Sequence, residues 1–333
     1  MNVSPTPLIR FLLRHGKGII AADDRPESMN KRLEEFKISP TSKNRTLYRE
    51  IVATTPGIER YISGVILHEE TLIATLSSGR SFHETLHARG IITGVKVDQG
   101  LEPYNKSAEQ TTKGIGTLSK RLVEYKKHGA QFCKWRCVFI ITDSTPSDDL
   151  IKENAKNLAM YVKTVLASDL VPIIEPEVLM EGNHSLSDCH EVTRRVLQSV
   201  FDAIENEKIN MAHIILKCNM ILPGKKAKVK ASPQEVAYET VECLHSAVPA
   251  ETGGIVFLSG GQSTIEAILN LNAICKISPL PWPVSFSFDR AFMYPVLSVW
   301  MGKEKNIKRA QDELLRVVKD VSTAREGHYK PHN

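Results

Sequence analysis

Three consecutive segments decide the fold: FCKWRCV at residues 132–138, SDDLIKENAKNLAMYVKTVL at 147–166, and VPIIE at 171–175. The first and third are short apolar runs, which is typical of strands that are buried on both faces. The middle segment repeats its apolar residues at about the 3.6-residue period of an amphipathic helix. A strand, a helix and a strand in this order predict two parallel strands joined by a crossover helix.

The same alternation continues in both directions along the chain. The strand candidates are residues 18–22, 64–67, 90–97, 132–138, 171–175, 214–216, 255–258 and 284–286. Helical stretches separate most of them, as at residues 186–206. Eight repeats favour closure, because a closed sheet has no exposed strand edges. The sequence therefore predicts the α/β class and a single (β/α)8 TIM barrel.

The chain has no sequence feature that divides it into domains. No linker rich in proline, glycine or serine interrupts residues 1–333, so we expect one barrel domain. Residues 76–82 and 101–116 are expected to be barrel loops. A last helix at about 305–321 is expected to precede a short polar C-terminal tail from about residue 322.

Composition limits the possible partners. The net charge of +5 suits a small anionic substrate, but it is too small to indicate a nucleic-acid partner. The basic run at residues 224–230 contains no aromatic residue that could stack on a base, so we expect a solvated loop there.

The cysteines and the apolar segments indicate a location. Six scattered cysteines without a CxxC pair are typical of a reduced intracellular protein. Residues 8–14 are apolar but contain two arginines, which favours a first amphipathic helix over a signal peptide. No run is long enough to span a membrane, so we expect a cytoplasmic protein without a membrane partner.

Ionisable residues stand at the C-terminal ends of five predicted strands, where buried parallel strands should be apolar. These residues are Asp23, Lys96, Asp98, Lys134, Arg136, Glu175, Glu177 and Lys217. Residues two apart on a strand point to the same side, so the two members of each of the pairs 96/98, 134/136 and 175/177 face the same way. Because barrel active sites form at this end of the strands, we expect the charges to converge and to pair with one another.

The lysines suggest the chemistry. A partly desolvated lysine among other cations loses its proton more easily and becomes an amine nucleophile. Lys134 and Lys217 together favour attack on a carbonyl group and formation of an imine. Carboxylates such as Glu175 would supply the proton transfers that imine formation and carbon–carbon cleavage require.

The last two strands lead into a candidate phosphate site. The seventh runs into Ser259-Gly260-Gly261, and the eighth into Ser287-Phe288-Asp289-Arg290. Phosphate sites of barrels commonly form after these two strands. Glycines allow backbone N–H groups to approach an anion, and an arginine can bind it through two hydrogen bonds.

Several motifs together resemble the class I fructose-1,6-bisphosphate aldolase family. They are GKGIIAAD at 16–23, GVKVD at 94–98, KWRC at 134–137, EPE at 175–177, LKCNM at 216–220 and FLSGGQS at 257–263. The resemblance covers residues from about 16 to about 329. It implies an aldehyde-lyase of glycolysis and gluconeogenesis that is cytoplasmic and homotetrameric. Such an enzyme reversibly cleaves fructose 1,6-bisphosphate to dihydroxyacetone phosphate and glyceraldehyde 3-phosphate, without metal or cofactor.

The resemblance also implies a role for each catalytic residue. Lys217 would form the Schiff base with the ketose C2 carbonyl. Glu175 would act as general acid and base while the carbinolamine forms and loses water. Asp23 would take the proton of the C4 hydroxyl during cleavage of the C3–C4 bond, and Lys134 and Glu177 would assist.

The remaining site residues would bind the substrate. By the same resemblance they comprise the C1-phosphate site, the substrate channel and the site of the second phosphate. The C1-phosphate site would consist of Ser259, Gly260, Ser287 and Arg290. The substrate channel would be lined by Arg32, Lys96 and Arg136. The site of the second phosphate would contain Ser28 and Arg25.

Two positions depart from the family pattern. Arg25 stands where the family has the first of two serines that contact the C6 phosphate, so it either strengthens phosphate binding or marks a different aldehyde end. Asp289 replaces a glycine whose backbone N–H contacts the C1 phosphate. Its carboxylate would weaken phosphate binding unless the side chain turns away.

Three other interpretations stay open at this point. The same catalytic set fits fructose 1-phosphate or sedoheptulose 1,7-bisphosphate. A non-catalytic aldolase-like binding protein could keep these residues by descent. A metal-dependent aldolase would need histidine ligands, and the candidate pair is His83 and His87, which have helical spacing but no third ligand nearby.

Overall fold

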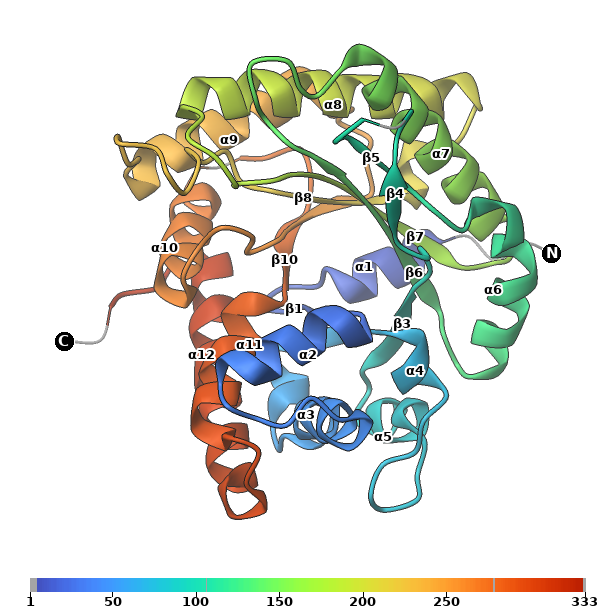
Figure 1. The fold of residues 1–333 in the computed structure, drawn as a ribbon, viewed down its shortest axis with the longest axis vertical. Coiled ribbons are helices and arrows are strands. Elements are labelled where there is room, and N and C mark those ends of the chain that lie inside the picture. The colour runs from blue at the N-terminus through green and yellow to red at the C-terminus, as the bar shows by residue number, and fades with distance from the viewer. Residues whose placement is uncertain (1–4, 106, 278, 332–333) are drawn as a thin grey trace.

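The computed structural model describes residues 5–105, 107–277 and 279–331, and its centre is a closed barrel of eight parallel strands (Figure 1). The strands are hydrogen-bonded in the order β1-β10-β9-β8-β7-β6-β3-β2. Their bounds are β1 (Gly18–Ala22), β2 (Ile62–Leu67), β3 (Ile92–Lys96), β6 (Phe132–Phe139), β7 (Val171–Val178), β8 (Ile215–Cys218), β9 (Gly254–Phe257) and β10 (Val284–Phe288). Each predicted strand overlaps one of these, so the prediction of a TIM barrel is confirmed.

Helices surround the barrel and pack their apolar faces against it. The longer ones are α2 (Pro26–Glu35), α3 (Ser42–Thr54), α6 (Leu118–Lys127), α7 (Asp148–Leu166), α8 (Leu186–Asn206), α9 (Pro233–Ala247), α10 (Thr264–Cys275), α11 (Arg290–Trp300) and α12 (Ile307–Arg325). The shorter helices are α1 (Thr6–Leu12), α4 (Glu69–Leu72) and α5 (Phe82–His87). Serines cap the starts of α8, α9 and α10, which fixes where each loop ends.

One end of the barrel is filled by apolar side chains. Ile9, Leu12 and Leu13, on or just after α1, pack against residues inside the barrel, including Ile19 and Phe132. The predicted first amphipathic helix is therefore confirmed and closes this end. A second core lies between the strands and the outer helices. Polar side chains inside the barrel are thus left to the opposite end.

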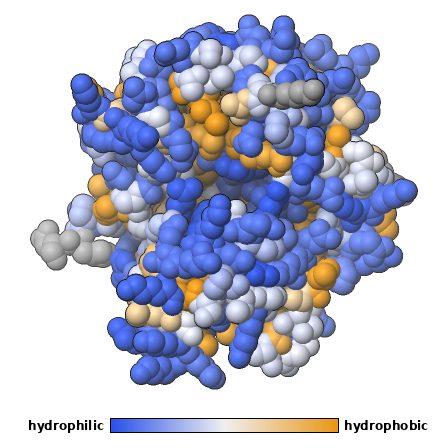
Figure 2. Space-filling model, in the orientation of Figure 1, coloured by the Kyte–Doolittle hydropathy of each residue, from blue (hydrophilic) through white to orange (hydrophobic). Residues whose placement is uncertain are grey.

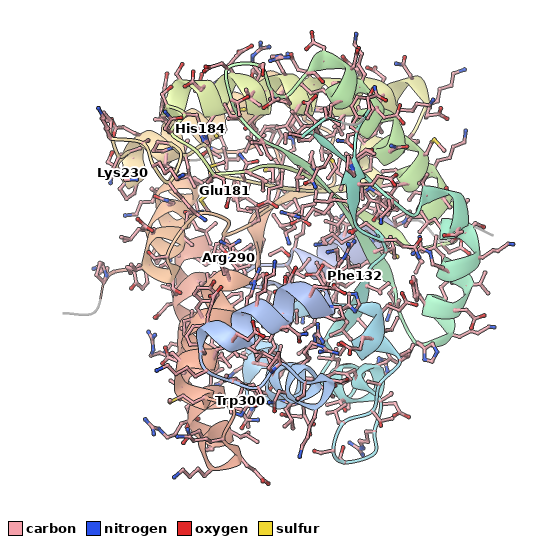
Figure 3. All side chains as sticks on the ribbon, in the orientation of Figure 1. Phe132, Glu181, His184, Lys230, Arg290 and Trp300 are labelled. Atoms are coloured by element: carbon pink, nitrogen blue, oxygen red, sulfur yellow. The ribbon has the colours of Figure 1, made fainter. Side chains whose placement is uncertain are left out.

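The contact between Gly94 and Phe132 gives a test of packing inside the barrel. A Cβ atom at residue 94 would lie 2.2 Å from the Phe132 ring (labelled in Figure 3), which is completely buried. We expect Gly94→Ala to lower the free energy of unfolding by about 1–3 kcal/mol, because the ring has no space into which to move. Urea denaturation measures this change. Gly116→Ala is the control, since a Cβ there meets nothing within 4 Å, and an equal loss in both variants would contradict the expectation.

Two segments differ from their predictions. Residues 101–116 are not only a loop, because β4 (Leu101–Pro103) and β5 (Gln110–Thr112) form a small antiparallel pair. The last helix, α12, continues through Arg325, a few residues past the point near residue 322 where the polar tail was expected to begin. Arg325 donates hydrogen bonds to the carbonyl oxygens of Val284 and Leu13, and the amide of Tyr329 donates to Asn272 Oδ1. The polar composition of this segment gave no indication of these hydrogen bonds.

Two further observations concern the surface. Residues 224–230 contain no helix or strand and include exposed lysines, as predicted for a solvated loop. Within the described ranges, no helix is long and apolar enough to cross a membrane.

Candidate active site

A cavity of about 210 Å³ lies at the end of the barrel opposite α1, where the strands lead into their C-terminal loops. All the predicted catalytic and binding residues line it, together with Asp24, Leu258 and Asp289. Figure 2 shows a hollow near the centre of this face, with hydrophilic side chains below it and an apolar patch above it. The expected convergence of charged strand ends is therefore observed.

Four charged side chains form a continuous chain at the bottom of the cavity. Lys217 Nζ lies 3.0 Å from Glu175 Oε1. Lys134 Nζ lies 2.6 Å from Glu175 Oε2 and 2.7 Å from Asp23 Oδ2. All four side chains are almost completely buried. The amine that the sequence predicts as nucleophile is thus next to a carboxylate and away from bulk solvent.

The strands place these groups through their alternation. Lys134 and Arg136 point into the cavity from β6, while Trp135 between them packs outward against Tyr161 of α7. The parallel register pairs Arg136 with Glu175 on β7. Residues two apart therefore reach the same cavity from one strand, and register brings neighbouring strands level.

Mutual attraction fixes the protonation of three of these groups. Burial opposes ionisation of Glu175, but Lys134 and Lys217 outweigh it and hold the pKa of this carboxyl well below its usual range. Lys134, Lys96 and Lys217 do the same to the pKa of Asp23, against its burial. The two carboxylates in turn raise the pKa of Lys134, although burial alone would lower it. At neutral pH, Lys134 is thus a fixed cation between two anions.

A second set of ion pairs surrounds this centre. Arg136 Nε lies 2.5 Å from Glu177 Oε2, and Arg25 Nη2 lies 2.7 Å from Asp98 Oδ1. Lys96 Nζ is 3.8 Å from the same oxygen of Asp98, and burial lowers the pKa of Lys96. The guanidinium group of Arg25, which the sequence suggested for phosphate binding, is therefore already paired.

Arg32 holds two carboxylates at once. Its Nη1 atom lies 3.1 Å from Asp24 Oδ2 and 3.1 Å from Asp289 Oδ2. All three side chains are at least three-quarters buried. The carboxylate of Asp289 thus turns towards Arg32 on α2.

The remaining part of the cavity lies at the end of β9 and β10. Ser259 Oγ accepts a long hydrogen bond (3.4 Å) from the amide of Ala291 at the start of α11. A Cβ at residue 260 would lie 2.8 Å from Glu177 Oε1, so a larger residue there would require the Glu177 side chain to move. In the view of Figure 3, Arg290 lies between helix α2 and the loop that carries Glu181.

The histidine pair considered for a metal lies elsewhere. His83 and His87 are on α5, with ring centroids 5.5 Å apart, and His83 Nδ1 is 3.2 Å from Thr93 Oγ1. In the part of the chain that the structure describes, no group of three His, Cys, Asp or Glu side chains is placed to hold a metal ion.

Comparison with known proteins explains this arrangement. A family model described as fructose-bisphosphate aldolase class-I matches residues 8–333. The chain belongs to the class I fructose-bisphosphate aldolase family. The family resemblance read from the motifs is therefore confirmed.

Individual members of the aldolase family match the sequence of this chain along nearly their whole length. This aldolase is 42% identical to the non-muscle fructose-bisphosphate aldolase of Lethenteron camtschaticum over 324 residues, which are 96% of this chain and 89% of that protein. It is 43% identical to a fructose-bisphosphate aldolase of Drosophila melanogaster over 317 residues, 94% of this chain and 88% of the relative.

A solved aldolase has the same fold. It is the fructose-bisphosphate aldolase of Plasmodium falciparum, crystallised in a ternary complex with TRAP and a small-molecule inhibitor. The TM-score is 0.96 at 39% identity, and the match covers 98% of this chain and 95% of the other.

Sequence reasoning missed Asp24 as a residue of the site. Asp24 follows Asp23 directly, and successive residues at a strand end point to opposite sides, so its neighbour gave no reason to place it in the cavity. The turn from β1 into α2 brings Asp24 back to the cavity wall, where it meets Arg32.

Proposed function

We propose that this protein is a metal-independent aldehyde-lyase that cleaves fructose 1,6-bisphosphate through a Schiff base on Lys217. The single observation that supports it best is the buried Lys217 amine, 3.0 Å from Glu175 and reached from the substrate cavity. Family membership supplies the reaction class, and the cavity supplies Glu175 for Schiff-base formation and Asp23 for the C4 hydroxyl proton.

Schiff-base formation uses Lys217 and Glu175. The Glu175 carboxylate takes a proton from the lysine, whose lone pair then attacks the C2 carbonyl of the ketose. The resulting carbinolamine receives a proton on its hydroxyl and loses water, which leaves the iminium ion. Despite its burial, Glu175 is kept anionic by Lys134 and Lys217, so it can act first as a base.

Cleavage uses Asp23. Its carboxylate takes the C4 hydroxyl proton, the C3–C4 bond breaks, and the bonding electrons move into the iminium to give an enamine. Glyceraldehyde 3-phosphate leaves; protonation of the enamine and hydrolysis then release dihydroxyacetone phosphate and the free lysine. Lys134, 2.7 Å from Asp23 and 2.6 Å from Glu175, keeps both carboxylates oriented and charged.

The two phosphates would lie at opposite parts of the cavity. We assign the C1 phosphate to the part formed by Ser259, Gly260, Ser287 and Arg290. Arg25 and Ser28 would face the other phosphate, with Lys96 nearby, and Arg32, Arg136 and Glu177 would line the channel between them. Because Arg25 is paired with Asp98, a second phosphate can pair with the Arg25 guanidinium group only if it competes with the Asp98 carboxylate.

Two properties of the molecule stay predictions. The cytoplasmic location is supported by its six free cysteines, which are typical of a reducing compartment. The homotetramer follows from the family resemblance alone.

The decisive experiment is reduction with borohydride in the presence of dihydroxyacetone phosphate, followed by peptide mass spectrometry. We expect a stable adduct on the peptide that contains Lys217, because borohydride reduces the imine to a secondary amine. Cleavage of fructose 1,6-bisphosphate should be unchanged by a chelator such as EDTA. An adduct on another lysine, or none, would favour a non-catalytic binding protein. Parallel assays with fructose 1-phosphate and sedoheptulose 1,7-bisphosphate establish which ketose is preferred.

A further inference from the structure

The charges that line the cavity are unevenly paired. Seven lysine and arginine side chains line it, and six of them form an ion pair with a carboxylate. Among residues 5–105, 107–277 and 279–331, Arg290 is the one cavity cation for which no such pair is found. An anion that enters the cavity therefore meets one positive side chain without a direct ion pair, at the start of α11. The carboxyl group of Glu181 is a nearby negative group, and Arg290 contributes to the lowering of its pKa after the effects of burial and Lys225.

The surroundings of Arg290 are built to receive a polar group. Ser287 lies on β10 beside the cavity, and its hydroxyl is completely buried with no hydrogen-bond partner among the described residues. A buried hydroxyl without a partner costs free energy unless a ligand supplies the hydrogen bond. Ser259 Oγ is occupied only by a long hydrogen bond to the Ala291 amide. These groups together mark the place where a ligand end is held.

Asp289 places a carboxylate next to this subsite. Its backbone φ of −116° is open to any residue, so the conformation does not explain why an aspartate stands there. The side chain is bound to Arg32, but Arg32 is bound equally closely to Asp24. One guanidinium therefore faces two carboxylates, and this cluster of three residues carries a net negative charge.

The cluster changes the charge at the phosphate end. Arg290 and the three clustered side chains sum to zero: two positive charges, from Arg32 and Arg290, and two negative charges, from Asp24 and Asp289. A neutral residue at position 289 would leave one net positive charge and would release Arg32 from one of its partners. Coulomb energy between groups a few ångströms apart in a partly buried site is large enough to alter affinity.

We propose that Asp289 is a specificity-determining residue, which weakens binding of a phosphate at the Arg290 end of the cavity. The cavity therefore discriminates only weakly between a ketone with a phosphate at this end and one with a hydroxyl. The inference rests on the proposed Schiff-base function, since it concerns the substrate end that lies beside Lys217.

The environment of Asp24 agrees with a shortage of positive charge. Burial and the nearby carboxylate of Asp289 raise the pKa of Asp24 to about 6, although Arg32 opposes the shift. The charged and titratable groups that act on this cluster come from β1, α2, α3, β3 and α11 with its N-cap. They are Asp23, Arg32, Tyr48, Arg49, Lys96, Asp289 and Tyr294. The shift of Asp24 therefore agrees with two carboxylates that share one guanidinium group.

The test compares two ketones that differ only in the phosphate. Borohydride trapping on the full-length protein is measured as a function of concentration, once with dihydroxyacetone phosphate and once with dihydroxyacetone. The ratio of the two half-saturating concentrations reports what the phosphate contributes. It is determined for the wild type, Asp289→Asn and Asp289→Gly, with Asp312→Asn as a control because Asp312 is an exposed carboxylate on α12.

We expect Asp289→Asn and Asp289→Gly to raise the preference for the phosphorylated ketone by about fivefold or more. Asp312→Asn should leave it unchanged. Asp24→Asn should raise this preference as well, because Asp24 is the other carboxylate that pairs with Arg32. This variant leaves residue 289 unchanged, so it distinguishes an effect of charge from an effect of the shape of residue 289. Circular dichroism confirms that each variant is folded.

The outcomes separate this inference from the proposed function. Adducts that form in every variant with a rise of less than about fivefold for both Asp289 variants would overturn the role of Asp289. Absence of an adduct on Lys217 with either ketone in the wild type would instead overturn the Schiff-base function, and this inference with it.

Discussion

Lys217→Met is expected to lower kcat for fructose 1,6-bisphosphate cleavage by a factor on the order of 10⁴ or more. Methionine is close to lysine in length and flexibility, but it has no amine to attack the C2 carbonyl. The covalent route through Lys217 is then closed. Lys134 lies between Asp23 and Glu175, and these two carboxylates raise its pKa, so it stays protonated.

The fold of this variant should survive. Glu175 loses Lys217 as a partner, but Lys134 still lies 2.6 Å from its other oxygen, so no buried carboxylate is left alone. Activity is followed by coupling release of the triose phosphates to a dehydrogenase assay. Lys308→Met is the control, because Lys308 is an exposed lysine on α12. Retention of more than about a hundredth of the wild-type kcat by Lys217→Met would exclude it as the nucleophile.

Asp23→Asn should separate cleavage from Schiff-base formation. We expect kcat to fall by about 10²–10⁴, since the asparagine amide cannot take the C4 hydroxyl proton. The adduct with dihydroxyacetone phosphate should still form, because that ketone has no C4 and its reaction uses Lys217 and Glu175. Asparagine has the same shape as aspartate, and Lys134 keeps its ion pair with Glu175.

Both measurements can be made on one preparation of the Asp23 variant. The rate of cleavage and the yield of the trapped adduct are compared with wild type and with Asp202→Asn, a change on the exposed face of α8. Equal loss of cleavage and of adduct would mean that Asp23 acts on the nucleophile or on folding, and its assignment to the C4 hydroxyl would then be wrong.

These expectations depend on features that could be read from the sequence to different degrees. The spacing of Lys134 and Arg136 predicted that both side chains face one side of a strand, and they do line one cavity. This succeeded because strand alternation is a property of the local backbone. The partners of these side chains were not predictable in the same way. Arg25 meets Asp98, which is 73 residues away, and Arg32 meets Asp289 at a separation of 257 residues.

The C-terminal segment shows the same limit. Its polar composition predicted a tail from about residue 322, but Arg325 is bound to carbonyl oxygens near both ends of the chain, those of Leu13 and Val284. A polar residue exposed to solvent and one that caps the end of the barrel look alike in a sequence. Only the acceptors that it meets in the folded chain distinguish them.

The barrel and the end at which its charges gather could be predicted from the sequence. Both follow from a period of two or 3.6 residues and from the direction of parallel strands, which are local properties, whereas the choice of Lys217 as nucleophile followed from the family resemblance. The tertiary structure alone decided which charges are paired: Arg25 with Asp98, Arg32 with Asp24 and Asp289, and Arg290 with none among the described residues. Pairing depends on distances between loops that only closure of the barrel brings together, because Coulomb attraction is set by separation in space.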